Sequence, residues 1–308
     1  MTGANEGLAR SVQVRLAAHA RAIGVDPNLV LARFATERFL YRLSVSPHAD
    51  RFVLKGALLL LAWLGETLRP TRDADLLGFG DVSDAALAQA FREVCAVPVA
   101  PDGLAFASDS VRVAPIRLDD RYGGKRVKLH GMLGKATLRV QVDVGIGDAV
   151  VPPPQWLEYP SLLDFARPRL RAYRRESVIA EKVHAMVALG SKNSRLRDFF
   201  DVHALAQREA FDGRVLTAAL RATFERRATV VPGRLPLALT PQFAAEKQSQ
   251  WGGFLRRSGL PPGLGDLRPV LEDLARFLGP PLEAVAAGSE FSAVWRPGGP
   301  WRAGPGGA

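Results

Sequence analysis

The sequence predicts an α+β (mixed α/β) protein with a sheet in its first half and mainly helices in its second. Three segments of the first half alternate between apolar and polar residues: SVRVAPIR (110–117), KRVKLH (125–130) and ATLRVQVDV (136–144). This period of two is typical of half-buried strands. In the second half, apolar residues recur instead at helical spacing over five segments. Together these patterns indicate a sheet with helices beside it.

The first half begins with two predicted helices and continues with short strands. Apolar spacing predicts helices over 8–23 and 28–43, with a break at Asp26 and Pro27. A strand at 52–54, a turn at Lys55 and Gly56, and a leucine-rich helix ending near residue 65 follow. The next elements are a strand over 74–79 and a helix over 85–94, which Ser83 can cap.

Prolines 152–154 mark a boundary, because a run of prolines is not expected inside a helix or strand. Beyond it, helices are predicted at 177–189, 195–209, 213–226, 241–257 and 267–286. The tail from 296 is rich in Gly and Pro and is expected to be disordered. The expected domains are a helical preface (1–50), a core (51–151), a mainly helical domain that completes the active site (152–295) and the tail (296–308).

The composition favours anionic partners and disfavours secretion. The chain of 308 residues carries 41 Lys and Arg against 31 Asp and Glu, a formal net charge of +10, which suits nucleotides, RNA or DNA. The single cysteine, Cys95, is expected to be a small buried side chain. No signal peptide is visible, and the most apolar segment, 52–65, is too short to cross a membrane. A cytoplasmic protein without membrane contact is therefore expected.

Asp73 and Asp75 are the first candidate functional residues. One residue separates them, so on a strand both side chains leave the same face, with Cα atoms about 6.5 Å apart. Two carboxylates this close suit a hard divalent ion such as Mg²⁺, which also binds substrate phosphates. The alternative is that they form ion pairs with Arg69 and Arg72 at a solvated strand entrance.

Two further features support a metal and phosphate site. Lys55 and Gly56 join a strand to a helix, so backbone amides and an ammonium could hold phosphate oxygens. Asp143 lies between apolar residues in a strand, where a charge is costly unless it is paired or bound to a metal. It could be a third metal-binding acid, or an edge-strand residue that faces water.

The second half contains two charged helical segments. Glu181, Lys182 and His184 lie within ESVIAEKVHAMVAL, where a solvated helix face would also explain them. Lys192, Arg195 and Arg197 precede Asp198 and Asp201, which suggests either an ion-pair network or a nucleotide-phosphate site. Neither His184 nor His203 has the spacing of a metal ligand, and no Walker-type phosphate loop or nucleophile-elbow motif is present.

The order of these motifs resembles a known family. FVLKGALLLL, RPTRDADLLGFGD, VDVGIGD, VIAEKVHAMV and NSRLRDFFDVHAL follow one another over about residues 52–205 and resemble the AbiEii/AbiGii nucleotidyltransferase-like toxins. The resemblance implies a DNA polymerase β-like nucleotidyltransferase fold that uses Mg²⁺ (or Mn²⁺) and a nucleoside triphosphate. It also implies a bacterial toxin with a cognate antitoxin, and in some members the acceptor is the 3′ end of tRNA.

The resemblance assigns roles residue by residue. The expected catalytic residues are Asp73, Asp75, Lys182 and Asp198. The expected metal ligands are Asp73, Asp75 and Asp143, and the expected nucleotide-binding residues are Lys55, Gly56, Ala57 and Arg72. Arg and Lys of the helical half would hold the RNA backbone.

One position departs from the family pattern. Many nucleotidyltransferases have Ser directly after the first Gly, whereas this chain has Ala57 and so lacks a hydroxyl for the triphosphate. The predicted function is Mg²⁺-dependent transfer of a nucleotide to a cellular acceptor, the 3′ end of tRNA, which blocks translation and growth. The alternatives are a nucleotide- or RNA-binding regulator with weakened catalysis and a nucleotidyltransferase that modifies an antibiotic.

Overall fold

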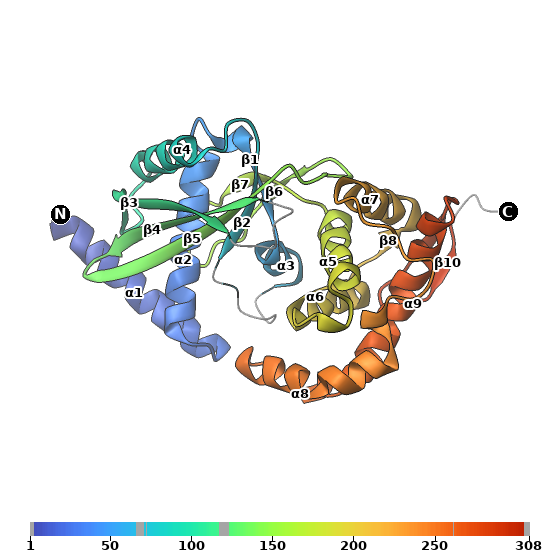
Figure 1. Ribbon diagram of the computed structural model, residues 1–308. Coiled ribbons are helices and arrows are strands. Elements are labelled where there is room, and N and C mark those ends of the chain that lie inside the picture. Colours follow the sequence, from blue (N-terminus) through green and yellow to red (C-terminus); the bar gives the residue numbers. More distant parts are fainter. Residues whose placement is uncertain (1–2, 66–70, 72, 117–122, 261, 305–308) are drawn as a thin grey trace. The chain divides into compact units, whose positions relative to one another are not determined.

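The computed structural model describes residues 3–65, 71, 73–116, 123–260 and 262–304 (Figure 1). The chain divides into two compact units. The first comprises Met1–Ala62, Pro70–Gly147 and Gln155–Ala172, and the second comprises Trp63–Arg69, Asp148–Pro154 and Tyr173–Ala308. The predicted boundary at 152 differs from this division, because residues 155–172 return to the first unit as two further strands.

A seven-stranded mixed sheet forms the first unit, in the order β3-β4-β5-β2-β1-β7-β6. Its strands are β1 (Phe52–Lys55), β2 (Ala74–Gly78), β3 (Leu104–Ile116), β4 (Gly124–Leu133), β5 (Ala136–Ile146), β6 (Gln155–Glu158) and β7 (Arg169–Ala172). β3, β4 and β5 are antiparallel neighbours, whereas β2 runs parallel to β5 and antiparallel to β1. The mixed α/β class predicted from the alternating segments is confirmed.

Two of the unit's helices pack on one face of this sheet (Figure 1). The helices of the unit are α1 (Gly3–Ile23), α2 (Pro27–Ser44), the short η1 (Ala49–Arg51), α3 (Ala57–Leu64) and α4 (Asp84–Ala96). Phe39 of α2 and Phe91 of α4 contact each other and reach Phe106 and Phe52 of the sheet. The half-buried and exposed residues of β4 and β5, which alternate with the buried ones, therefore face away from α2 and α4. This second face, which includes Arg126 and Asp143, is called the open face below.

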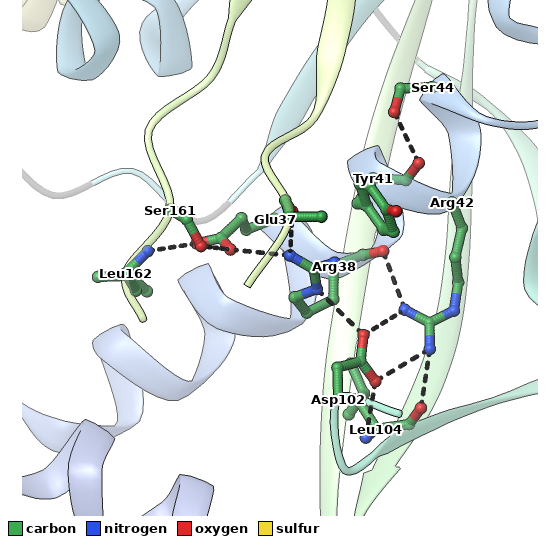
Figure 2. A network of polar contacts seen from close by, with 10 residues as sticks. Glu37, Arg38, Tyr41, Arg42, Ser44, Asp102, Leu104, Ser161 and Leu162 are labelled. Carbon is green, nitrogen blue, oxygen red and sulfur yellow. Dashed lines mark hydrogen bonds and ion pairs between the residues drawn. The ribbon is translucent and has the colours of Figure 1, made fainter. Parts of the chain in front are cut away.

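A buried charged network fixes α2 to the sheet (Figure 2). Asp102 accepts hydrogen bonds from Arg38 Nε at 3.0 Å and from both terminal nitrogens of Arg42 at 2.8 and 3.1 Å. Glu37 accepts from the Ser161 hydroxyl at 2.6 Å and the Leu162 amide at 2.8 Å. Sequence patterns gave no sign of this network, because charged residues on a helix are normally solvated.

The network shifts the pKa values of its two carboxyl groups in opposite directions. Burial dominates for Glu37 and raises its pKa, although the contacts with Ser161, Leu162 and Arg38 oppose that shift. Burial would also raise the pKa of Asp102, but the hydrogen bonds and charges of Arg42, the Leu104 amide and Arg38 outweigh it, so the pKa falls. Asp102 is therefore a charged residue held in the core by two guanidinium groups.

The second unit contains helices and a small sheet. Its helical segments are α5 (Arg175–Leu189), η2 (Gly190–Lys192), α6 (Leu196–Arg208), α7 (Gly213–Arg226), η3 (Leu237–Leu239), α8 (Pro241–Arg257), η4 (Pro262–Leu264) and α9 (Leu267–Ala286). The sheet, in the order β10-β9-β8, consists of β8 (Phe211–Asp212), β9 (Ala293–Trp295) and β10 (Trp301–Ala303).

Residues 301–303 of the C-terminal tail form a strand where the sequence predicts disorder. Trp301–Ala303 forms β10 and pairs with β9. The Trp301 ring stacks on Phe277 with centroids 5.7 Å apart, and its Nε1 donates to the Phe277 carbonyl at 2.8 Å. The composition-based prediction was wrong for residues 301–303 because the tryptophan buries enough aromatic surface to hold a Gly- and Pro-rich segment in place. Residues 305–308 lie outside the described part of the chain.

The structure also bears on the expectations for Cys95 and for membrane-spanning helices. Cys95 is buried as predicted, and burial raises the pKa of its thiol to about 12. Across the described residues, every helix is too short or too polar to span a bilayer.

Candidate active site

The turn between β1 and α3 brings Gly56 against Asp75. Gly56 has a φ of +72°, a conformation that L side chains rarely adopt. A Cβ at this position would lie 2.1 Å from Asp75 Oδ2 and 2.7 Å from its Cγ. Glycine is therefore needed here both for the backbone conformation and for the space that the Asp75 carboxylate occupies. Sequence order suggested that the Lys-Gly turn would approach the paired acids, and the structure places Gly56 against Asp75.

Four charged residues form one row across the open face of the sheet. Lys55 of β1 is the register partner of Asp75 on β2, Asp75 is the partner of Asp143 on β5, and Asp143 is the partner of Arg126 on β4. Directly paired residues point to the same side of a sheet, and neighbouring strands lie about 4.8 Å apart. All four side chains are partly buried. The row, named the catalytic row below, thus places two carboxylates between two cations.

Arg126 is the member of the catalytic row that sequence reasoning missed. Its Nε and Nη2 donate to the two carboxylate oxygens of Asp143 at 2.8 and 2.7 Å, a bidentate pair. The hydrogen bond that Arg126 donates to Asp143 is the largest cause of its raised pKa; burial opposes this shift, and the charges of Asp143, Asp73 and Asp75 add to it. Arg126 therefore lies within the electrostatic field of all three predicted acids.

The structure changes the expectation for Asp143. This residue is not on an edge strand, because β5 lies between β4 and β2. Its carboxylate is bound by Arg126, and among the described residues no group of three or more His, Cys, Asp or Glu side chains is arranged to hold a metal ion. Both oxygens of the third predicted acid are thus engaged by a guanidinium in this structure. The carboxylates of Asp73 and Asp75, two positions apart in the chain, supply the hard oxygen ligands that still suit a single divalent ion.

Lys182 and Asp198 lie in the second unit, together with Asp201. Lys182 Nζ on α5 donates to Asp198 Oδ1 at 2.6 Å and to Asp201 Oδ2 at 2.8 Å, both on α6. The Lys182 and Asp198 side chains are 11% and 10% exposed and that of Asp201 is 1% exposed. Lys192, Arg195 and Arg197, which the sequence grouped with these acids, are exposed on the surface.

The polar residues of α5 are not on a solvated face. Glu181 receives a hydrogen bond from the Tyr173 hydroxyl at 3.3 Å and lies 3.7 Å from an Arg227 nitrogen. His184 is buried, and its ring contacts the Thr229 hydroxyl at 2.9 Å. Burial, helped by the charge of Arg227 and opposed by Asp148, lowers the pKa of His184 to about 4. The histidine is therefore neutral at physiological pH.

Arg72 and Ala57 are the remaining residues predicted to bind the nucleotide. Arg72 lies outside the described residues, as does Arg69, so the predicted ion pairs of these arginines with Asp73 and Asp75 do too. Ala57 begins α3 directly after Gly56, so its backbone amide is at a helix N-terminus but its side chain offers no hydroxyl.

The family is shown by comparison with known proteins. A family model described as "Nucleotidyl transferase AbiEii toxin, Type IV TA system" matches residues 38–283. No curated protein matches the chain. Two solved structures from Helicobacter pylori are alike at 17% identity and cover 82% of this chain: JHP933, with a TM-score of 0.41 and 89% of its own chain covered, and a candidate nucleotidyltransferase, with a TM-score of 0.40 and 92% covered.

The protein is a nucleotidyltransferase. More particularly, the chain belongs to the AbiEii family of type IV toxin–antitoxin systems, since the family model covers most of its length. Membership implies a nucleoside triphosphate substrate, a divalent metal ion and a cognate antitoxin.

Proposed function

We propose that this protein is a toxin that transfers a nucleoside monophosphate from a nucleoside triphosphate to the 3′ end of tRNA, which blocks translation and growth in the cytoplasm. The observation that carries the proposal is the contact between Gly56 and the Asp75 carboxylate within the catalytic row. This contact joins a candidate phosphate-binding turn to a candidate metal-binding acid. The fold proposed for the first unit is that of the DNA polymerase β-like nucleotidyltransferases.

The residues of the turn would bind the triphosphate. The N-terminus of α3, directly after Gly56, would offer backbone amides to phosphate oxygens, and Lys55 would add a positive charge from the end of β1. Asp73 and Asp75 would hold Mg²⁺ or Mn²⁺, which when bound polarises the phosphoryl group and lowers the pKa of the acceptor hydroxyl. In the transfer, the acceptor oxygen bonds to the α-phosphorus, the bond to pyrophosphate breaks, and the hydroxyl proton passes to water.

The open face of the sheet favours a polyanionic acceptor. Arg112 on β3, Lys128 and His130 on β4 and Arg139 on β5 are exposed. The register places these residues on the same face as Arg126 and Asp143. Alternate residues along a strand lie about 6.6 Å apart, which is close to the spacing of successive phosphates in a nucleic acid strand. Cations in the first unit therefore support RNA as the acceptor, in addition to those that the sequence placed in the helical half.

Lys182 and Asp198 are proposed to take part in catalysis through their ion pair. Asp198 holds the Lys182 ammonium in a fixed position, 2.6 Å away, so the lysine could present a positive charge to phosphate. Lys182→Met is expected to reduce transfer at least about 100-fold, because it removes the positive charge proposed to stabilise the phosphate in the transition state. Lys192→Met, which removes an exposed lysine from the same unit, is the matched control.

Labelled nucleoside triphosphates, Mg²⁺ and total RNA test the proposal directly. The expected result is a single added nucleotide at tRNA 3′ ends with the wild type, found by sequencing RNA 3′ ends, and none with Asp75→Asn. Asp81→Asn is the matched control, because this exposed acid follows the same strand and only caps the turn at Ser83. Label on no macromolecule with a folded sample would contradict the proposal.

The second candidate function is a regulator with weakened catalysis, which Ala57 motivates. In that case Asp75→Asn would leave binding and growth arrest unchanged, whereas a toxin that acts by transfer would lose growth arrest. Modification of an antibiotic, the third possibility, would give resistance rather than growth arrest on expression.

A further inference from the structure

Arg126 occupies a distinctive position for a cation in a metal-dependent site. Its guanidinium is on the open face of the sheet, next to Asp143 in the catalytic row. The two contacts with Asp143, at 2.8 and 2.7 Å, use both carboxylate oxygens. Only two of the five N–H donors of a guanidinium are needed for such a pair, which leaves three directed elsewhere.

The pair changes what Asp143 can do. A carboxylate whose two oxygens both accept charge-assisted hydrogen bonds from one guanidinium has to break at least one of them to bind a metal ion. A divalent ion beside Asp143 would also be repelled by the positive charge of Arg126, since both side chains are partly shielded from solvent, Asp143 at 20% and Arg126 at 37% exposure. The arrangement therefore disfavours an ion at Asp143.

The charge balance of the site is already met with one ion. Among the described residues, the three carboxylates Asp73, Asp75 and Asp143 are accompanied by the cations Lys55 and Arg126, so one divalent ion brings the sum of these charges to a net positive value for a triphosphate. Without Arg126, the same acids would attract a second ion. The guanidinium is planar and always charged, and it binds phosphate oxygens in a fixed geometry, so it can supply the charge of a second ion at this position.

We propose that Arg126 takes the place of a second divalent cation: one ion binds to Asp73 and Asp75, and Asp143 positions Arg126 toward the phosphates. This inference rests on the proposed nucleotidyl transfer. Asp143 is then a positioning residue and not a metal ligand. Arg126 contributes binding of the triphosphate and neutralisation of the charge that develops on it.

Counting bound Mn²⁺ tests the inference without relying on activity. The full-length chain is saturated with a non-hydrolysable α,β-methylene nucleoside triphosphate, and bound Mn²⁺ is measured by electron paramagnetic resonance. The expected stoichiometry is one ion per chain for the wild type and for Asp143→Asn, with dissociation constants within about twofold of each other. Arg126→Gln is expected to bind a second ion, because the Asp143 carboxylate is released.

A matched control shows whether the loss of any nearby cation is enough to admit a second Mn²⁺ ion. Lys125→Gln removes a cation from the adjacent position of β4, which is paired with Asp84 on the opposite face, and should keep one ion. Two ions in the wild type, a tenfold weaker ion in Asp143→Asn, or no second ion in Arg126→Gln would overturn the inference and leave nucleotidyl transfer standing. No ion in the wild type would overturn the proposed function and the inference together. If Arg126→Gln does not fold, as judged by circular dichroism, the Asp143→Asn measurement still decides.

Discussion

Gly56 shows how one residue can serve both the backbone and the chemistry of a site. Its left-handed conformation turns the chain from β1 into α3, and its missing side chain makes room for the carboxylate of Asp75. Any side chain at this position would have to push that carboxylate away from its place in the catalytic row.

Gly56→Ala should therefore reduce transfer about 100-fold, because displacing a catalytic group by about 1 Å has an effect of that size. The measurement is kcat/KM for the nucleotide. Gly80→Ala is the control, since Gly80 has a similar φ of +75° but nothing within 4 Å of the position of a Cβ. Equal losses in the two variants would mean that backbone strain, and not the contact with Asp75, is responsible.

Ala57 is expected to limit nucleotide affinity. A hydroxyl at the first residue of α3 could donate a hydrogen bond to a phosphate oxygen, and a hydrogen bond to a charged group contributes about 1.5–3 kcal/mol. Ala57→Ser should therefore lower KM for the nucleotide by about tenfold or more with the acceptor held saturating. Ala62→Ser, farther along the same helix, should leave KM unchanged.

Asp102 is expected to hold α2 in position through its bonds to Arg38 and Arg42. Asp102→Asn would leave Arg38 and Arg42 buried without their charged partner and should destabilise the first unit by about 3–5 kcal/mol, measured by urea unfolding. Asp109→Asn, at an exposed position of β3, should change stability by less than about 0.5 kcal/mol. Similar effects of the two substitutions would show that the buried network does not hold the helix.

Asp102 also makes the free energy of unfolding depend on pH in the acidic range. The folded pKa of Asp102 lies below its ordinary value of 3.8, so its contribution is fully present above about pH 3.8 and is lost as the pH falls through the folded pKa. The stability difference between the wild type and Asp102→Asn should therefore be constant above that pH and shrink below it. A difference that shrinks near neutral pH would contradict this assignment.

At the scale of the element, β10 is expected to stabilise the second unit although it is only three residues long. Trp301→Ala removes the ring that stacks on Phe277 and the hydrogen bond to its carbonyl. The expected loss is about 2–3 kcal/mol in chemical unfolding. Trp156→Ala, at a position that is 54% exposed, should cost less than about 1 kcal/mol.

Local patterns predicted most elements but not the contacts between distant ones. The helix over 213–226 has the predicted bounds, and the three alternating segments are strands β3, β4 and β5. The strands from β6 to β10 were missed because each has only two to four residues, too few for a visible period. β1 is equally short, but the Lys-Gly turn that follows it marked its end.

Within the candidate site, only contacts between residues close together in the sequence could be predicted. Lys55, Gly56, Asp73 and Asp75 follow one another closely, so their meeting could be inferred from the order of strand, turn, helix and strand. Arg126 could not be found this way, since its approach to Asp143 depends on the register between β4 and β5. The alternation in KRVKLH assigns Arg126 to a face but does not say which residue lies opposite.

At the scale of the whole molecule, the net charge of +10 should make binding of the acceptor strongly salt-dependent. Replacing both Lys128 and Arg139 by Gln should reduce the slope of log K against log salt by about two, because each phosphate contact contributes about one. Nitrocellulose filter binding of tRNA at several salt concentrations measures the slope.

A charge-matched control distinguishes local contacts from net charge. Arg167→Gln together with Arg10→Gln removes the same charge from exposed positions of the first unit that lie outside the open face. This pair should leave the slope nearly unchanged. An equal reduction in both double variants would mean that overall charge, and not the open face, attracts the acceptor.

The catalytic row also has a consequence for how the sheet assembles. A strand that slipped by one residue would turn every side chain to the other face. Asp75, Asp143 or Arg126 would then be forced among the phenylalanines beneath α2 and α4, where an unpaired charge is very costly. The groups proposed to carry out the chemistry therefore also penalise misaligned strands during folding, so that a sheet able to form its core has, by the same alignment, assembled its reactive face.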